Sequence, residues 1–254
     1  MLNLIKYEFR KDRNILLVMG SGLLLLQLFY LYSIIVKSED KIAVGIVLLT
    51  IYAWVCFFSV FILAVINYSR ELNSKSSYLI FMTPNSSYTI IFSKMLSILV
   101  IGAVMAVIIG FLGCLDLHLL GIAIPETGTF SSLINEMLIS LGVPVDTLLL
   151  SALSGLITFL IYFFASVAIV YLSITLSATF LQNSKLKNIL SAGLFFLISF
   201  LQSKVVDMLP LLYDPPRDIL ESILSVIPAT VFNLALLIVC IYGCGKLLDK
   251  KVSL

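Results

Sequence analysis

Long stretches without a charged side chain constrain this sequence most. Six of them occur along its 254 residues, over residues 14–36, 42–66, 95–115, 147–172, 188–203 and 222–245. A helix needs about 20 apolar residues to cross about 30 Å of hydrocarbon, and five stretches meet that length. The fifth stretch is shorter and crosses only if the long side chain of Lys204 extends to the interface. The pattern predicts an all-α integral membrane protein with six transmembrane helices in a single domain over residues 1–254.

Composition excludes the soluble class. Hydrophobic residues make up 61% of the chain and charged residues only 12%, whereas soluble domains average about 25% charged residues. The positions of these few charged residues along the chain are therefore more informative than the net charge.

Basic residues gather on one side of the predicted spans. Twelve of the sixteen Lys and Arg residues precede the first span, follow the last, or lie in the connections after the second and fourth spans. Ten of the fourteen acidic residues, Asp116 among them, fall in the other connections. Since Lys and Arg near span ends are retained in the cytoplasm, we expect both termini to be cytoplasmic in a plasma-membrane protein. Six spans satisfy this without a charged residue in the hydrocarbon.

Two further segments are expected at the membrane surfaces. Residues 1–13 have an apolar and a basic helical face, which favours a helix lying in the cytoplasmic interface, with a plain basic flank as the alternative. The proline-rich residues 207–221 are expected to form a structured outer segment between the last two spans. Residues 133–141 show helical apolar spacing and predict a second surface helix in the third connection.

Catalytic chemistry finds little support in the sequence. The predicted spans hold no acid, base or metal ligand set, and the only histidine, His118, follows the third span. We expect no metal or cofactor in this chain, no nucleic-acid partner, and cysteines that act as small buried hydrophobes. The lack of acidic and basic residues within the predicted spans also disfavours an ion-coupled transporter. No Gly-x-x-x-x-Gly-Lys-Ser/Thr loop occurs, so we expect no ATP hydrolysis by this chain.

Residues 67–94 form the most informative connection, which the charge rule places in the cytoplasm. A short helix is expected to begin near Arg70 and to end at Pro84, because proline cannot continue a helix. Its apolar face combines aromatic, Leu and Met side chains. Such a face suits either docking into the groove of a cytosolic partner or contact with lipid.

The layout resembles the permease subunits of ABC transporters with the type V, or ABC-2, exporter fold. The resemblance rests on the amino-terminal amphipathic helix, on six spans with both ends inside, and on a pattern between spans two and three: Glu71, Tyr78-Leu79, Pro84, Ser86-Ser87 and Lys94. Family members often have a glycine after the Glu, where this chain has Asn73 and Ser74.

The resemblance implies that residues 67–94 are a coupling segment that docks on a separate ABC ATPase subunit, which binds the ATP and Mg²⁺. It also implies a second permease, either another copy or a close relative. The docking residues would be Arg70, Glu71, Lys75, Tyr78, Leu79, Phe81, Met82 and Pro84.

The expected activity is export of an amphipathic or hydrophobic cargo, with peptides preferred by analogy with the family. Aromatic residues of spans two and four either line the pathway or pack in the bundle: Tyr52, Trp54, Phe57, Phe61, Phe159 and Tyr162. The alternative function is a non-transporting membrane scaffold or immunity protein that binds a cytosolic partner through residues 67–94.

Overall fold

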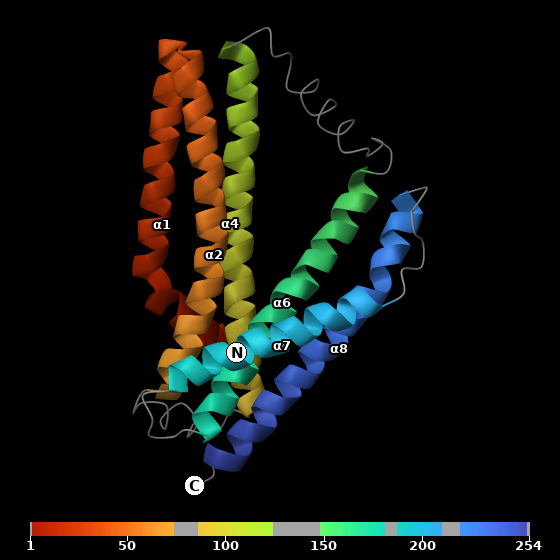
Figure 1. Ribbon diagram of the computed structural model, residues 1–254. Coiled ribbons are helices and arrows are strands. Elements are labelled where there is room, and N and C mark those ends of the chain that lie inside the picture. Colours follow the sequence, from red (N-terminus) through yellow and green to blue (C-terminus); the bar gives the residue numbers. More distant parts are fainter. Residues whose placement is uncertain (1, 74–85, 124–147, 181–186, 210–218, 253–254) are drawn as a thin grey trace. The chain divides into compact units, whose positions relative to one another are not determined.

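The computed structural model describes residues 2–73, 86–123, 148–180, 187–209 and 219–252. Their regular structure is entirely helical (Figure 1) and consists of α1 (Leu2–Val36), α2 (Glu39–Asn73), α4 (Ser87–Ala123), α6 (Leu148–Phe180), α7 (Lys187–Met208) and α8 (Ile219–Val252). Each of these six helices is long and apolar enough to cross a membrane. The chain is an all-α, multi-pass membrane protein, and the six predicted spans are confirmed within the described residues.

The helices extend beyond the uncharged stretches from which they were predicted. The third stretch ends at Leu115, but α4 continues to Ala123. Asp116 therefore lies within a helix and not in a connecting loop, which corrects the sequence-based assignment. The physical reason is that residues 117–123 are apolar apart from His118, so one carboxylate did not end the helix.

The amino-terminal residues are helical, as their amphipathic pattern predicts. They are continuous with the first span, since α1 is a single helix from Leu2 to Val36. Figure 1 shows α1 changing direction near its amino-terminal end, so its first turns run at an angle to the rest of the helix. Glu8 and Lys11 form an ion pair one turn apart in this part, with 3.9 Å between Oε2 and Nζ.

The connection from α1 to α2 is tight. Lys37 has a φ of 53°, in the left-handed region, and its N–H donates to the carbonyl of Ile34 at 3.0 Å. This conformation terminates α1 at the position that glycine normally occupies. Glu39 and Asp40 lie in the first turn of α2, where acidic side chains favour the helix dipole.

The chain divides into two compact units. The first unit contains residues 1–63 and 96–142, and the second contains residues 64–95 and 143–254. Both α2 and α4 therefore contribute one part to each unit.

In the first unit, tyrosines connect α1 to its neighbours. Tyr52 of α2 donates its hydroxyl to the carbonyl of Met19 at 2.8 Å, and Gly22 leaves the space that this ring occupies. Tyr30 of α1 is fully buried and packs on Gly45 of α2. A Cβ on Gly45 would lie 3.1 Å from the Tyr30 ring, so glycine permits this close approach.

In the second unit, α6 packs most extensively against α8 and also against α7. The buried core covers every face of the middle of α6, where residues 167–171 are all buried, and it also includes Ala165 and Ile174. Helix α7 has no buried residue of its own within its described length. It is linked to α8 by the amide of Gln202, which donates to the carbonyl oxygen of the fully buried Asn233.

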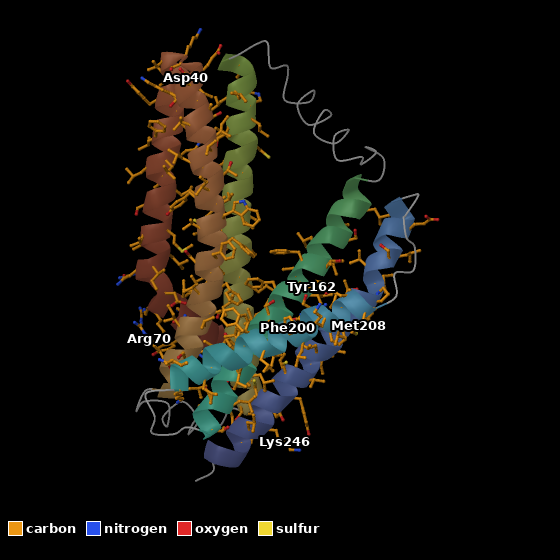
Figure 2. The ribbon with its side chains drawn as sticks, in the orientation of Figure 1. Asp40, Arg70, Tyr162, Phe200, Met208 and Lys246 are labelled. Carbon is orange, nitrogen blue, oxygen red and sulfur yellow. The ribbon has the colours of Figure 1, made fainter. Side chains whose placement is uncertain are left out.

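Large apolar side chains cover much of the outer surface of both units. Leu25 is 68% exposed and Phe196 is 69% exposed, as expected for helices that face lipid and not water. Figure 2 shows Asp40 and Arg70 at opposite ends of α2, with a long apolar stretch between them. The expected outer surface helix at residues 133–141, and residues 210–218 of the expected outer segment, lie outside the described residues.

Candidate functional site at the ends of the 67–94 segment

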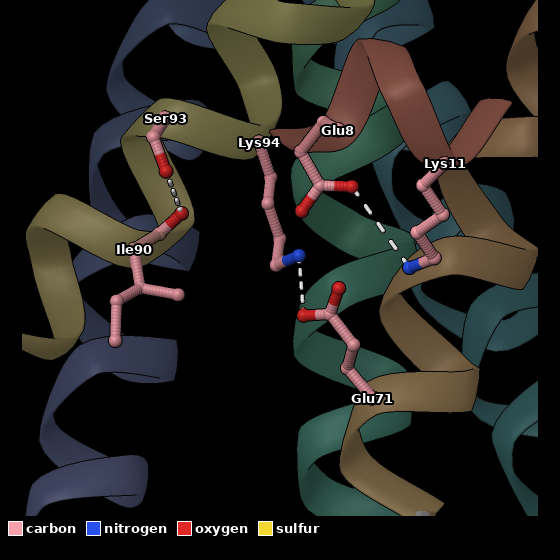
Figure 3. A network of polar contacts seen from close by, with 6 residues as sticks. All are labelled: Glu8, Lys11, Glu71, Ile90, Ser93 and Lys94. Atoms are coloured by element: carbon pink, nitrogen blue, oxygen red, sulfur yellow. Dashed lines mark hydrogen bonds and ion pairs between the residues drawn. The ribbon is translucent and has the colours of Figure 1, made fainter. Parts of the chain in front are cut away.

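A buried ion pair connects the two described ends of the 67–94 segment. The ammonium of Lys94, on the first part of α4, donates to the carboxylate of Glu71 near the end of α2 (Figure 3). The side chain of Lys94 is 7% exposed and that of Glu71 is 13% exposed. A desolvated pair of this kind holds its two helices firmly, because breaking a buried ion pair is strongly destabilising.

Tyr68 connects the same end of α2 to α6. Its ring stacks on Tyr171, with centroids 4.0 Å apart and planes inclined by 15°. Its hydroxyl lies 2.6 Å from Oγ1 of Thr175, which also donates to the carbonyl of Tyr171 at 2.8 Å. Thr175 in turn lies 3.9 Å from the thiol of Cys244 on α8.

The first turn of α4 is held by α8. Ser87 donates its hydroxyl to Asp249 with an Oγ–Oδ1 distance of 2.5 Å. The neighbouring Tyr88 ring lies over Gly245, where a Cβ would overlap the ring. Tyr88 also stacks on Tyr242, with centroids 6.4 Å apart. These contacts fix where the chain enters α4.

Together these contacts join four helices around the segment's two ends. We refer to Tyr68, Glu71, Ser87, Lys94, Thr175 and Asp249 as the clamp. Its groups are committed to one another, and no group of three or more metal-binding side chains occurs among the described residues. The arrangement suits mechanical transmission, because a displacement of residues 74–85 would pull on α2 and α4 and, through the clamp, on α6 and α8.

The predicted docking residues are only partly described. Arg70 is exposed, whereas Glu71 is engaged within the clamp. The other predicted docking residues lie outside the described part of the chain: Lys75, Tyr78, Leu79, Phe81, Met82 and Pro84.

The predicted pathway aromatics occupy two separate units. Tyr52, Trp54, Phe57 and Phe61 belong to the first unit, and Phe159 and Tyr162 belong to the second. Trp54 is 61% exposed and contacts Phe57 edge-on at 6.4 Å, and Phe159 is 50% exposed and stacks on Phe163 at 6.3 Å. Trp54, Phe57 and Phe159 therefore pack with near neighbours of their own helices, while Tyr52 bonds to α1.

Sequence reasoning did not anticipate most of the clamp. The sequence pattern includes Glu71 and Lys94 but does not pair them. Their opposite charges, at the end of one span and the start of the next, are a signal from which the ion pair could be predicted. Thr175 and Asp249 carry no local signal, because their partners are distant in sequence.

Comparison of the chain with protein-family models, with curated proteins and with solved structures found no match.

Proposed function

We propose that this chain is the membrane-spanning permease subunit of an ATP-driven exporter, with ATP hydrolysed by a separate ABC ATPase subunit docked on residues 67–94. The supporting observation is the clamp. A coupling segment has to pass the movement of a docked ATPase to the spans, and this requires rigid attachment at both of its ends. The contacts Lys94–Glu71, Tyr68–Thr175 and Ser87–Asp249 supply such an attachment.

In this proposal Glu71 holds the segment in place, and residues 78–82 make the docking contact. The exposed Arg70 is available to a partner at the segment's edge. The excess of Lys and Arg at the chain ends and in residues 67–94 supports a cytoplasmic position for both termini and for the segment. The bend near the start of α1 supports an interfacial position for residues 1–13.

The proposed cargo is amphipathic or hydrophobic, and peptides are our preferred class by analogy with the exporter family. Apolar side chains dominate the exposed surfaces of both units, which offers little to a highly charged solute. The working assembly would contain a second permease, either another copy or a relative, together with the ATPase subunits, in the plasma membrane.

The test is co-purification of the full chain from its native membrane, scored for a bound ATPase by mass spectrometry and ATP hydrolysis. Tyr78→Asp with Phe81→Asp places two charges on the proposed docking face and is expected to abolish the bound ATPase. The matched control is Leu212→Asp with Tyr213→Asp, which makes a comparable change in the segment expected on the opposite side of the membrane. The control is expected to retain the ATPase.

Three outcomes would contradict this assignment. An ATPase that never copurifies, or one lost equally from both double variants, removes residues 67–94 as its docking site. Capture of a partner without nucleotide-binding motifs would support the scaffold or immunity function instead. Both double variants should first give monodisperse protein in detergent, so that misfolding is not scored as lost docking.

A further inference from the structure

A second polar cluster lies within the first unit. Gln27 of α1 donates its amide to Oδ1 of Asp116 on α4 at 2.5 Å. Tyr30, one turn further along α1, donates its hydroxyl to the backbone carbonyl of Asp116 at 2.9 Å. Gln27 lies ten residues before Lys37, which is about 15 Å along the helix at 1.5 Å per residue. A carboxylate at such a position in an apolar helix marks a functional site by default, since it is expensive to retain there.

A pocket of about 320 Å³ opens beside this cluster and is lined by α1, α2 and α4 of the first unit. This volume lies at the lower end of the range of roughly 300–1,000 Å³ that is typical of small-molecule sites. Its walls are mainly apolar and include Leu23, Leu49 and Leu120. Ile46 and Leu117 also line the pocket and are exposed, so the rim faces the surroundings of the helices.

Gln27 gives the pocket an unsatisfied acceptor. The residue is only 6% exposed, and its Oε1 is buried without a hydrogen-bond partner. An orphan acceptor in an apolar site carries a desolvation penalty that a bound donor would remove. Asp116 adds further acceptor capacity, because each carboxylate oxygen accepts more than one hydrogen bond.

We propose that this pocket binds a primary ammonium attached to a compact apolar body. The N–H groups of the ammonium donate to Oε1 of Gln27 and to the carboxylate of Asp116, its charge compensates that carboxylate, and its apolar body fills the leucine-lined space. Entry past Ile46 and Leu117 suits a molecule that partitions into the membrane. The proposal concerns the first unit alone and does not depend on the docking of an ATPase.

The oxygen atoms that line the pocket suit an ammonium group better than a metal ion. Hard divalent cations take six or more oxygen ligands. The polar side chains that line this pocket are only the carboxylate of Asp116, the amide of Gln27 and the hydroxyls of Tyr30 and Thr50, and both hydroxyls already donate to backbone carbonyls. The described residues contain no cluster of three or more acidic, His or Cys side chains that would supplement them. An ammonium needs only as many acceptors as it has N–H groups.

The test measures binding of 2-phenylethylammonium to the purified full chain in lipid nanodiscs, by calorimetry and by the shift in thermal unfolding. Two probes of similar shape separate the contributions. 2-Phenylethanol lacks the charge, and trimethyl-(2-phenylethyl)ammonium keeps the charge but has no N–H donor. We expect saturable binding of the primary ammonium, and affinities lower by about tenfold or more for both other probes, because hydrogen bonds to charged groups are the strong ones.

Three variants locate the site. Asp116→Asn keeps the shape and the bond from Gln27 but removes the charge, and it is expected to weaken binding about tenfold or more. Ala53→Leu fills the pocket while leaving both polar residues intact, and it should abolish binding. Asp40→Asn removes an exposed carboxylate of the same unit and should leave affinity unchanged.

The proposal is overturned if 2-phenylethanol binds as tightly as the ammonium, if Asp116→Asn and Asp40→Asn behave alike, or if sodium alone stabilises the wild type and the ammonium does not. It is also overturned if no probe binds to wild-type protein that is monodisperse. Ala53→Leu keeps the test decisive if Asp116→Asn fails to fold.

Discussion

Tyr68 lies flat against Tyr171, with ring centroids 4.0 Å apart, and its hydroxyl lies 2.6 Å from Thr175 on the next turn of α6. Both tyrosines are almost completely buried. The Tyr68 side chain thus joins α2 to α6 by ring stacking and by a hydrogen bond. It does so near the end of α2, just before residues 74–85.

Substitutions at Tyr68 should separate these two contributions. Tyr68→Phe keeps the stack and removes the hydroxyl, so we expect a loss of about 0.5–1.5 kcal/mol in the free energy of unfolding. Tyr68→Ala also removes the ring and leaves a cavity, so the expected loss is about 3–5 kcal/mol. Unfolding by SDS titration of the protein in mixed micelles measures both. Tyr7→Ala, at a 60% exposed position, is the control and should be nearly neutral. Equal losses for Phe and Ala would contradict the importance of the stack.

The ion pair of the clamp predicts a charge-specific effect on stability. Lys94→Met or Glu71→Gln removes one member of this buried ion pair, and each is expected to destabilise the protein by about 3–5 kcal/mol. The combined variant, Lys94→Met with Glu71→Gln, removes both charges and should recover much of that loss. Thermal unfolding of the three variants in detergent measures the effect.

The control for the ion pair is Arg70→Met, which removes an exposed positive charge next to Glu71. It should change stability by less than about 1 kcal/mol, as is usual for exposed charges. A double variant that loses as much as the sum of the two single variants would show that Lys94 and Glu71 do not depend on each other.

The sequence predicts those features of the fold that depend on residues close together in the chain. Hydropathy is local, so the six spans and the helicity of residues 2–13 are readable from composition along the chain. The ends of the helices are harder to predict. The uncharged stretch of the third span ends at Leu115, because Asp116 is charged, but α4 continues to Ala123.

The contacts that form the two sites depend on side chains distant in sequence. Gln27 and Asp116 are 89 residues apart, and Ser87 and Asp249 are 162 apart. No single-sequence pattern specifies such pairings, because they follow from which helix faces meet. The sequence places Gln27 and Asn233 within apolar stretches, but it does not reveal which residues they bond to.

A further prediction concerns the polar link between α7 and α8. Gln202 donates to Asn233, whose own amide donates to the carbonyl of Ala229 at 2.6 Å. Polar pairs between membrane helices contribute about 0.6 kcal/mol on average and about 1.7 kcal/mol at most in double-mutant cycles. Because α7 buries no residue of its own in the described structure, we expect a coupling energy in the upper part of that range.

The cycle for this pair uses Gln202→Leu, Asn233→Leu and the combined variant, with unfolding in SDS as the readout. A cysteine pair placed across α7 and α6 would report whether α7 itself has loosened. Ser203→Leu, at an exposed neighbouring position, is the control. A coupling energy near zero would mean that α7 is held by its contacts with α6 alone.

The left-handed conformation of Lys37 gives a prediction with a definite sign. A side chain at this φ costs roughly 1–2 kcal/mol relative to glycine, because Cβ approaches the following carbonyl oxygen. Glycine loses more backbone entropy on folding, which offsets part of the gain. We therefore expect Lys37→Gly to stabilise the protein by about 0.5–1 kcal/mol. Lys41→Gly, four residues later within α2, should destabilise it by about 1 kcal/mol, because glycine is unfavourable inside a helix. Thermal unfolding of the two variants side by side decides the matter, and two changes of the same sign would rule out a strained backbone at Lys37.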